Sequence, residues 1–415
     1  MKTISVQGPA GRIDGEVMLP ISKSIANRLL VMSSFETLID PGQSPLPEDV
    51  KILYNLLTSD SKILRAGHAG TAYRFMLVKC AMSPGQRTLE GSDRMHQRPI
   101  APLVDALRAL GADICYLGRE GYPPVRVVGK NLISSSPIAL RADISSQFIS
   151  ALLMAAPYVK NGMDLRLEGQ ILSRPYIDMT LDLMRNCGVK VEETEKSIKV
   201  SEGRYTRFPE EVEMDWSAAS YFLGIPLLQG GGQLLLRGLT EDSIQGDAVA
   251  LKWFESLGLQ REFSSAGLRI WTEEEFRSPA EPLALDFTDC PDLAQTMTFF
   301  CLASGMKARF RGCYNLNLKE TQRLDKLREY VVLCGGNILP ADEADALFFN
   351  PPASVWLSDR QILPTHGDHR MAMSAALLAT AGNHIWLENP EVVKKSFPLF
   401  WKALGGIGFR IESDT

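Results

Sequence analysis

Five segments of this chain share one pattern of apolar and polar positions. Each is a run with apolar residues at helical spacing that ends in a glycine and is followed by a short alternating stretch typical of a strand. The segments are VDALRALGADI, LDLMRNCGVKV, LKWFESLGLQ, LREYVVLCGGNI and LFWKALGGIGFRI. Their glycines stand at positions 111, 188, 258, 335 and 408, at intervals of 77, 70, 77 and 73 residues. This recurrence predicts a repeated structural unit.

Each unit also contains a second helical run with a polar start. Examples are Ser145-Ser146-Gln147 before FISALLMAA and Asp292 before LAQTMTFFCLA. Helices that alternate with short strands predict α/β units. A sixth copy is expected near Leu53 to Ser59, but KILYNLLTSD lacks the glycine and most of the following strand. One unit is therefore expected to be shortened.

Composition indicates a globular protein with two or three domains. The chain has 415 residues, of which 45% are apolar and 22% are charged. A net charge of -5 argues against nucleic acid or an anionic membrane as the main partner. We therefore expect a small ligand, and any anion site must come from local clustering of Arg and Lys.

Cysteine usage and apolar runs predict a cytoplasmic location. The seven cysteines form no CxxC pair, which suits reduced thiols in a cytosolic enzyme. The first residues, MKTISVQ, are too polar for a signal peptide. The longest apolar runs, such as Phe148 to Val159, are too short to span a bilayer.

The segment LPISKSIANR, residues 19–28, has the composition of an anion site. If Ser22 or Ser24 caps a helix that runs through Arg28 to about Ser34, backbone N–H groups, hydroxyls and two cations can converge on one phosphate. A solvated, well-capped helix start is the alternative interpretation of this segment alone.

Further cations also stand at or near predicted helix starts. They are Arg74 in GHAGTAYR, Arg94 in GSDRMHQRP, Lys319 and Arg323 in KETQR, Arg370 in HGDHR, and Lys394 and Lys395 in KKSFP. The helix macrodipole disfavours a cation at this end unless an anion is also present. Several such exceptions in one chain therefore indicate functional anion sites.

The sequence HGDH, residues 366–369, raises a metal hypothesis, because His and Asp are metal ligands. Arg370 follows directly and would repel a cation, so we favour Asp368 as the cap of the helix RMAMSAALLATA and as a residue that orients Arg370. The chain contains no GxSxG elbow, no P-loop and no GxGxxG between strand and helix.

Together these segments resemble the 5-enolpyruvylshikimate-3-phosphate (EPSP) synthase family of enolpyruvyl transferases. The family motifs LPGSKSxxNR, NAGTAxR and RMxxRPI are similar to LPISKSIANR, HAGTAYR and RMHQRPI. Further matches follow in the family's order: SSQFxxALLMAAP from Ser145, SxPYIxxTLxLM from Ser173, PDxA from Pro291, KExxR from Lys319, DHRMAM from Asp368 and KSFP from Lys395.

The resemblance implies a two-domain inverse α/β barrel of six βαβαββ-type repeats, three in each domain, with one repeat shortened. It places residues 1–19 and 214–415 in one domain and residues 20–213 in the other, with a hinge near 20 and 214. The two domains are expected to close over the substrates.

The resemblance also implies a reaction. The enolpyruvyl group of phosphoenolpyruvate is transferred to the 5-hydroxyl of shikimate 3-phosphate through a tetrahedral intermediate, phosphate is released, and no metal or other cofactor takes part. Lys23, Asp292 and Glu320 are the matching catalytic positions, with Asp292 as the base at the attacking hydroxyl and Glu320 as the proton donor to C3. A cytoplasmic monomer is expected, with no nucleic-acid or membrane partner.

The binding residues carried over by the resemblance fall into two sets. Those expected to bind phosphoenolpyruvate are Lys23, Gly70, Arg94, Gln147, Arg323, Arg370 and Lys395. Those expected to bind shikimate 3-phosphate are Lys23, Ser24, Arg28, Ser145, Ser146, Gln147, Ser173, Tyr176, Asp292, Asn315 and Lys319. Arginine forks suit a phosphate and a carboxylate alike.

The chain departs from the family pattern at three places. Ile21 replaces the usual Gly, His68 stands where Asn is common, and the segment from Ile39 to Gly67 is too short for a full repeat. Two alternatives stay open: a UDP-N-acetylglucosamine enolpyruvyl transferase, and a non-catalytic relative that binds shikimate phosphates. The former family has a catalytic-loop Cys, whereas Cys115 here lies in the strand-like ADICYLG.

Overall fold

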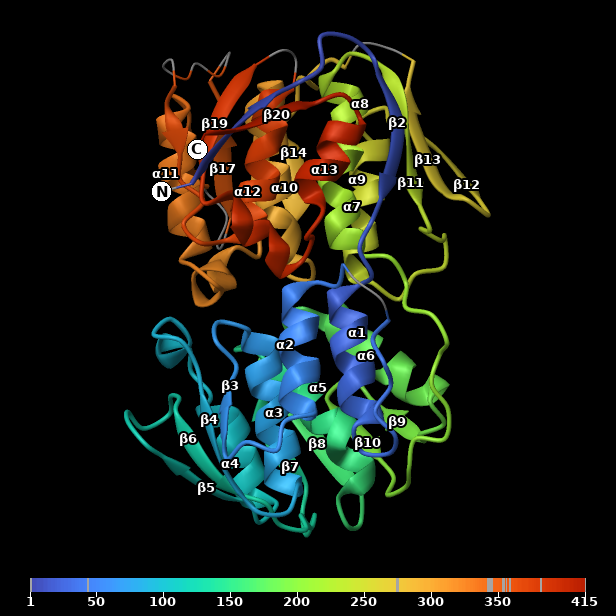
Figure 1. The fold of residues 1–415 in the computed structure, drawn as a ribbon, viewed down its shortest axis with the longest axis vertical. Coiled ribbons are helices and arrows are strands. Elements are labelled where there is room, and N and C mark those ends of the chain that lie inside the picture. The colour runs from blue at the N-terminus through green and yellow to red at the C-terminus, as the bar shows by residue number, and fades with distance from the viewer. Residues whose placement is uncertain are drawn as a thin grey trace. The chain divides into compact units, whose positions relative to one another are not determined.

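The computed structural model of the chain describes residues 2–42, 45–273, 276–341, 346–352, 355, 357, 360–380 and 383–414. The chain forms two units (Figure 1). Unit 1 consists of Met1–Ser22 and Glu213–Thr415, and unit 2 consists of Lys23–Val212.

Among the described residues, five four-stranded sheets repeat one topology, in which two parallel strands are followed by two that join antiparallel. Unit 1 holds three of them: β18 (Ile362–Leu363), β19 (His384–Glu388), β1 (Thr3–Gln7), β20 (Arg410–Asp414); β2 (Ile13–Met18), β11 (Gly232–Arg237), β13 (Gly267–Thr272), β12 (Gln260–Ser264); β14 (Leu283–Asp286), β15 (Ala308–Arg311), β17 (Leu347–Asn350), β16 (Asn337–Pro340). Unit 2 holds two: β3 (Ile63–Arg65), β4 (Gln86–Glu90), β6 (Val125–Val128), β5 (Asp113–Tyr116); β7 (Ile138–Arg141), β8 (Met163–Glu168), β10 (Ser197–Val200), β9 (Val191–Glu193).

The first two strands of the chain complete sheets built from its second half. β1 pairs antiparallel with both β19 and β20, and β2 runs parallel to β11 with Ile13 opposite Gly232. In Figure 1 the blue β1 and β2 therefore lie among the red and yellow-green strands of unit 1. The chain leaves unit 1 after Ser22 and returns to it at Glu213.

The helices form the interior of each unit. Unit 1 contains α7 (Trp216–Leu223), α8 (Ile225–Leu228), α9 (Val249–Glu255), α10 (Ala294–Ser304), α11 (Arg323–Leu333), α12 (His369–Ala375) and α13 (Phe400–Gly406). Unit 2 contains α1 (Lys23–Ser33), α2 (Glu48–Leu57), α3 (Gly70–Met82), α4 (Ala101–Ala109), α5 (Ser146–Ala155) and α6 (Arg174–Asn186).

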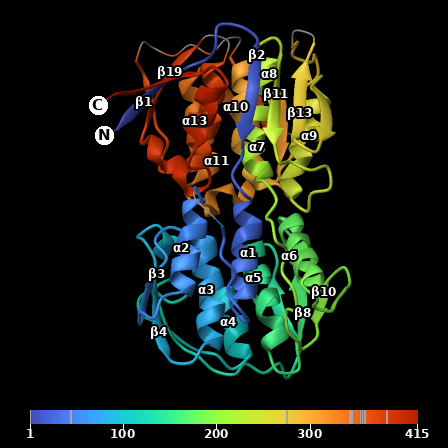
Figure 2. The ribbon, with the colours of Figure 1, turned by 45° about the vertical axis from the view of Figure 1, so that its right-hand side comes forward.

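Two helices show why the helices lie inside the strands. Nine of the ten residues of α5 and nine of the eleven residues of α10 are buried. A helix that is buried on all sides needs neighbours on all sides, so it takes a central position. Figure 2 shows α1, α3 and α5 of unit 2 between the sheet of β3 and β4 and the sheet of β8 and β10. The predicted mixed α/β architecture with inner helices is confirmed.

The glycine pattern predicted the repeats correctly. Each of the five glycines follows a helix (α4, α6, α9, α11 and α13), and each precedes a strand (β5, β9, β12, β16 and β20). Their φ angles lie between 87° and 99°, a region that side chains disfavour and that commonly ends a helix. The helix predicted over RMAMSAALLATA divides into α12 and a 3-10 turn, Ala376–Ala379.

The shortened repeat is the first one of unit 2. Between α1 and α3 the described residues form only α2 and the short β3, which belongs to the sheet of the next repeat. The loop after α1 is held by side chains instead of a sheet. Phe35 stacks on Tyr158 with ring centroids 4.6 Å apart, the Tyr158 hydroxyl donates to Glu36 at 2.6 Å, and the ammonium of Lys79 lies 4.1 Å from the Phe35 ring centroid.

Aromatic contacts fix the helices of unit 1 that carry charged residues at their starts. The ring of Phe299 in α10 packs edge-on against Tyr330 in α11, with centroids 4.9 Å apart, and Phe300 packs against Phe254 in α9 at 5.0 Å. These rings are almost fully buried. Because the helices are held by a dense apolar core, the side chains at their N-termini have defined positions.

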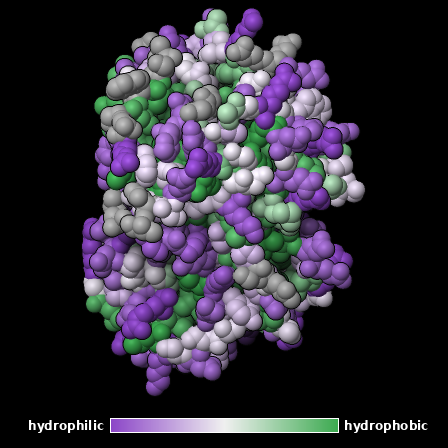
Figure 3. Space-filling view, turned by 45° about the horizontal axis from the view of Figure 1, so that its top comes forward, coloured by the Kyte–Doolittle hydropathy of each residue, from purple (hydrophilic) through white to green (hydrophobic). Residues whose placement is uncertain are grey.

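The face drawn in Figure 3 mixes hydrophilic and hydrophobic residues over its surface. Over the described ranges, no helix combines the length and the apolar character that a membrane crossing requires.

Candidate active site

In unit 1, charged side chains gather at the starts of helices and at short 3-10 turns. They are Asp292 in the turn Pro291–Leu293 before α10, Glu320 after the turn Tyr314–Leu318, Arg323 as the first residue of α11, Arg370 in the first turn of α12, and Lys395 at the end of the turn Pro390–Lys395. These five were predicted from four separate motifs, since Glu320 and Arg323 share one, and unit 1 brings them together.

Arg323 is the centre of this cluster. Its guanidinium donates to Asp368 Oδ2 at 2.7 Å, to Asp292 Oδ1 at 2.8 Å and to Glu320 Oε2 at 2.8 Å. The side chain is 1% exposed. Burial alone would lower the pKa of Arg323, but the three carboxylates outweigh it and raise that pKa.

Asp368 caps α12, as predicted. Its Oδ1 accepts a hydrogen bond from the Arg370 backbone N–H at 2.9 Å, while its other oxygen accepts from Arg323. The carboxylate is fully buried. Asp368 thus sets the start of α12 and holds the guanidinium of Arg323 at the same time. In the described part of the chain no three His, Cys, Asp or Glu residues are grouped as a metal site requires.

Asp292 is surrounded by cations. Its Oδ2 lies 2.7 Å from Arg370 Nη2, and its Oδ1 lies 2.8 Å from Arg323 Nη1 and 3.9 Å from Lys319 Nζ. Burial raises the pKa of Asp292, but Arg370, Lys319 and Arg323 outweigh burial and hold that pKa well below its usual range. The carboxylate is therefore ionised.

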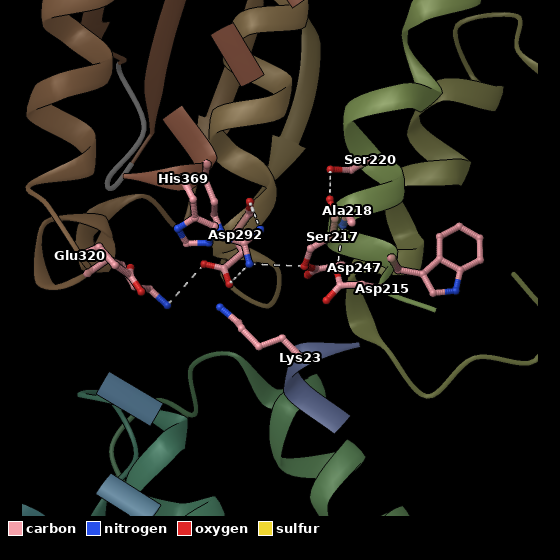
Figure 4. Close-up of polar contacts among 12 residues, drawn as sticks. Lys23, Asp215, Ser217, Ala218, Ser220, Asp247, Asp292, Glu320 and His369 are labelled. Carbon is pink, nitrogen blue, oxygen red and sulfur yellow. Dashed lines mark hydrogen bonds and ion pairs between the residues drawn. The ribbon is translucent and has the colours of Figure 1, made fainter. Parts of the chain in front are cut away.

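Glu320 bridges two cations of the cluster. One of its oxygens accepts from Arg323, and the other lies 3.3 Å from Lys395 Nζ. The Lys395 side chain is only 5% exposed, so its ammonium depends on this partner. Figure 4 shows Asp292 with Glu320 on one side and Ser217 and Asp247 on the other.

Ser217, Tyr221 and Asp247 join the cluster, and sequence reasoning missed all three. Arg370 contacts the hydroxyls of Tyr221 at 3.3 Å and Ser217 at 3.4 Å, and the Ser217 hydroxyl donates to Asp247. Burial, together with the charge of Asp292, raises the pKa of Asp247 to about 6. The polar sequence Gln245-Gly246-Asp247 before a helical run was the available signal.

Lys319 and Asn315 are two further predicted ligands of unit 1. Lys319 is a quarter exposed and lies at the edge of the cluster, 3.9 Å from Asp292. Asn315 is buried in the turn Tyr314–Leu318, and its Oδ1 has no hydrogen-bond partner within the described ranges.

In unit 2, α1 runs from Lys23 to Ser33, which confirms the predicted helix through Arg28 and places its start directly after Ser22, one of the two proposed caps. The Lys23 ammonium lies 3.4 Å from Asp49 Oδ2, in the first turn of α2, and both side chains are largely buried. The sequence does not mark Asp49, because an acidic residue in a first helical turn is common.

Ile21, which stands where the family usually has Gly, forms an antiparallel bridge with Met214. Ile21 is not among the residues with positive φ, so its backbone conformation accepts a side chain.

Arg28 is buried between three helices. Its guanidinium donates to the Thr180 hydroxyl at 2.8 Å, to the Ser150 hydroxyl at 3.1 Å and to the carbonyls of Ser24 and Tyr176 at 2.9 and 3.1 Å. These bonds use four of its five N–H groups. Burial lowers the pKa of Arg28 to about 10 and outweighs the opposing effect of Tyr176.

The start of α5 carries the predicted Ser145-Ser146-Gln147. Ser145 is the N-cap, and its hydroxyl accepts from the Gln147 backbone N–H at 3.3 Å. The Gln147 side chain accepts a hydrogen bond at Oε1 from Arg74 Nη1 at 2.8 Å. The sequence indicates Arg74 only as one of several cations near helix starts. It assigns no role to Arg98, which lies close to Gly70.

The other predicted residues of unit 2 lie at helix starts or turns. Gly70 opens α3, Ser146 opens α5, and Ser173 precedes α6 with φ at 54°. Arg94 donates to Gln97 Oε1 at 3.2 Å, within the same short turn. Tyr176 lies in the first turn of α6, and His68 is exposed before α3.

Solved structures identify the fold. EPSP synthase from Acinetobacter baumannii superimposes with a TM-score of 0.75 over 100% of both chains, at 18% sequence identity. The enolpyruvyl transferase NikO from Streptomyces tendae superimposes with a TM-score of 0.68 over 100% of this chain and 99% of its own, at 14% identity. The fold is the two-domain inverse α/β barrel of the enolpyruvyl transferases.

Sequence comparison gives the particular family. The family model EPSP synthase (3-phosphoshikimate 1-carboxyvinyltransferase) matches residues 49–404. The 3-phosphoshikimate 1-carboxyvinyltransferase of Bacteroides fragilis is 38% identical over 97% of both chains, and that of Neisseria meningitidis serogroup B is 32% identical over 98% of this chain and 99% of its own. The chain therefore belongs to the EPSP synthase family. It is an enzyme, a transferase of aromatic amino-acid biosynthesis.

Proposed function

We propose that this chain transfers the enolpyruvyl group of phosphoenolpyruvate to the 5-hydroxyl of shikimate 3-phosphate and releases phosphate. Family membership supports the reaction. The assignment of residues is supported by the charged cluster of unit 1. In this cluster the carboxylates of Asp292, Glu320 and Asp368 form ion pairs with Arg323, Arg370, Lys319 and Lys395.

Phosphoenolpyruvate brings a phosphate and a carboxylate, so it needs cations that can exchange partners. Arg370 and Lys395 each hold a carboxylate of the chain, Asp292 and Glu320 respectively. A substrate anion that takes over either cation frees the carboxylate beside it for proton transfer. Arg323 is the third proposed contact, held in place by Asp368.

The two carboxylates divide the acid and base roles. In the addition step the 5-oxygen of shikimate 3-phosphate bonds to C2 of phosphoenolpyruvate, Asp292 accepts the hydroxyl proton, and Glu320 donates a proton to C3. In the elimination step the Glu320 carboxylate takes a proton back from C3, the C2=C3 double bond forms again, the C2–O bond to phosphate breaks, and the departing phosphate takes up the proton held by Asp292. Lys23 and the cations of unit 1 stabilise the negative charge on the phosphate.

Substrate binding also prepares Asp292 as a base. Without substrate, Arg370, Lys319 and Arg323 hold the pKa of Asp292 too low for it to accept a proton readily. The substrate phosphate and carboxylate offset these positive charges, so the pKa of Asp292 rises when both substrates are bound. The base is thus strengthened only when a hydroxyl is present to be deprotonated.

Unit 2 supplies the groups proposed for shikimate 3-phosphate. Ser145 and Ser146 stand at the N-terminus of α5, where backbone N–H groups favour a phosphate. Ser173, Tyr176, Ser24 and the remaining N–H of Arg28 complete this set, with Asn315, Lys319 and Asp292 contributed by unit 1. Gly70, Arg94, Gln147 and Lys23 are the contacts of unit 2 proposed for phosphoenolpyruvate, and Gln147 and Lys23 are proposed to contact shikimate 3-phosphate as well.

The assigned residues come from both units, so we propose that the units close on the substrates about a hinge near residues 20 and 214. Mutual repulsion of the cations opposes closure without anions. Small-angle scattering should show a smaller radius of gyration when shikimate 3-phosphate and phosphoenolpyruvate are both present. Identical curves with and without both substrates would contradict the hinge.

We further propose that the enzyme works in the cytoplasm as a monomer, without a nucleic-acid or membrane partner. The net charge of -5 supports this, because a polyanion would be repelled. Light scattering after size exclusion should give a mass near 45.9 kDa.

The decisive experiment measures phosphate release by the purified chain with phosphoenolpyruvate and each of two acceptors. We expect turnover with shikimate 3-phosphate and none with UDP-N-acetylglucosamine. Turnover with only the nucleotide sugar would assign the alternative reaction. Binding of shikimate 3-phosphate without any phosphate release would mark a non-catalytic relative.

A further inference from the structure

A hydrogen bond in unit 2 joins α3 to the start of α5. Arg74 Nη1 donates to Gln147 Oε1 at 2.8 Å. Arg74 is 3% exposed, and its guanidinium carbon lies 5.2 Å from the ring centroid of Phe148, the next residue of α5. The donor is therefore held on two sides by α5.

This bond determines which end of the Gln147 amide faces away from Arg74. A guanidinium has only N–H donors, and the amide has one acceptor atom, its oxygen. The reversed amide would place NH₂ against the guanidinium, donor against donor. With the oxygen turned towards Arg74, the two amide N–H donors point elsewhere and can serve an anion.

The absence of a side chain at Gly70 leaves room for this arrangement. An ideal Cβ at Gly70 would lie 2.7 Å from Arg74 Nη1 and 2.4 Å from Arg98 Nη1. Both arginines are buried, with exposures of 3% and 6%. Gly70 and Arg74 are four residues apart, so they lie on one face of α3. The guanidinium of Arg74 therefore packs against the first turn of its own helix.

We propose that Arg74 is a positioning residue, which locks the Gln147 amide so that its N–H groups face the substrate anion. The proposal rests on the proposed function, in which Gln147 contacts phosphoenolpyruvate and shikimate 3-phosphate. Without Arg74 the amide can turn and present its oxygen to the anion, which repels it. Arg74 acts on the substrates through Gln147 and contacts neither of them.

A double-mutant cycle tests the proposal. The variants are Arg74→Met, Gln147→Ala and the double variant, and the measurements are KM and kcat for phosphoenolpyruvate at saturating shikimate 3-phosphate. Loss of a hydrogen bond to a charged group predicts a rise in KM of about tenfold or more for Gln147→Ala. Arg74→Met should cause a similar rise, and the double variant should match Gln147→Ala within about twofold.

Two further variants separate positioning from a merely structural role. Arg74→Lys keeps a hydrogen-bond donor at this position and should recover part of the affinity for phosphoenolpyruvate that Arg74→Met loses. If Arg74→Met does not fold, Arg74→Lys replaces it in the cycle. Arg65→Met removes an exposed arginine of β3 paired with Glu90 and should leave KM unchanged. If Arg74→Met lowers only the melting temperature, or if the effects of the single variants multiply in the double variant, the proposal is wrong.

The same cycle is also measured as the dissociation constant of phosphoenolpyruvate by calorimetry, in the presence of shikimate 3-phosphate. A wild-type chain that binds but does not turn over would refute the proposed function, and the cycle of dissociation constants would still decide on Arg74. A chain that turns over but shows no coupling refutes only the role of Arg74. A chain that neither binds nor turns over refutes both.

Discussion

The carboxylate of Asp292 lies 2.7 Å from the guanidinium of Arg370. The proposed base is thus paired with a residue proposed to bind a substrate anion. This pair links binding to catalysis, because a substrate that takes over Arg370 also changes the charge around Asp292.

Asp292→Asn should leave a folded protein and lower turnover by a factor on the order of 10² to 10⁴, because an amide cannot accept the hydroxyl proton. Steady-state phosphate release measures the effect. Asp325→Asn, which alters an exposed acid in the first turn of α11, is the matched control and should be as active as the wild type. Near-wild-type turnover of Asp292→Asn would remove it from the catalytic set.

Glu320→Gln should abolish proton exchange at C3. In D₂O the wild-type enzyme should place deuterium on C3 during addition and retain some of it after elimination, so the recovered enolpyruvyl group carries label. Mass spectrometry of the product and of recovered phosphoenolpyruvate measures this label. If Glu320→Gln still incorporates deuterium at the wild-type rate, another group protonates C3.

Lys23→Met should lower turnover and also stability, for separate reasons. Turnover falls by orders of magnitude because a cation at the phosphate is lost. Stability falls by about 3 kcal/mol because the buried carboxylate of Asp49 loses its partner. Adding Asp49→Asn should restore most of the free energy of unfolding but none of the turnover, which urea unfolding and activity assays can distinguish. Recovery of turnover in the double variant would contradict the role of Lys23.

Asp247 should make the folded protein less stable as pH rises. Its pKa is raised from 3.8 to about 6 in the folded state, so the folded chain keeps a proton that the unfolded chain has lost. The free energy of unfolding therefore falls between about pH 4 and pH 6, by roughly 3 kcal/mol at most, and stays lower above that range. Asp247→Asn should remove this decline. Parallel stability curves for the two proteins would show that Asp247 does not titrate in this range.

Gly70→Ala should weaken phosphoenolpyruvate binding without unfolding the chain. The new methyl group would displace the guanidiniums of Arg98 and Arg74, so KM should rise about tenfold while kcat changes less. Gly203→Ala, where a Cβ would meet nothing within 4 Å, is the matched control. An unchanged KM for Gly70→Ala would show that the two arginines can move without affecting Gln147.

The repeats were predictable because their signals are local. A helix that ends at Gly111 or Gly335 needs a left-handed residue within its own last turn, so a few neighbouring positions suffice to recognise it. The cap that Asp368 forms on α12 involves a backbone N–H two residues further on, and it was predicted correctly for the same reason. The resemblance to a known family extended these local signals to the topology of the whole chain.

What the sequence by itself determined is therefore the recurring unit of a helix, a glycine and a strand, the family and the identity of most charged residues at helix starts. Only the tertiary structure decided which of these charges meet. Arg323 finds Asp292, Glu320 and Asp368 at separations of 31, 3 and 45 residues, and Arg28 finds Thr180 at a separation of 152. Asp49 carries no local signal of its role, and the short motifs around Asp247 and Arg74 do not name the residues with which these two side chains pair. Their pairing depends on how buried helices pack, because a buried charge takes whatever partner the packing places within reach.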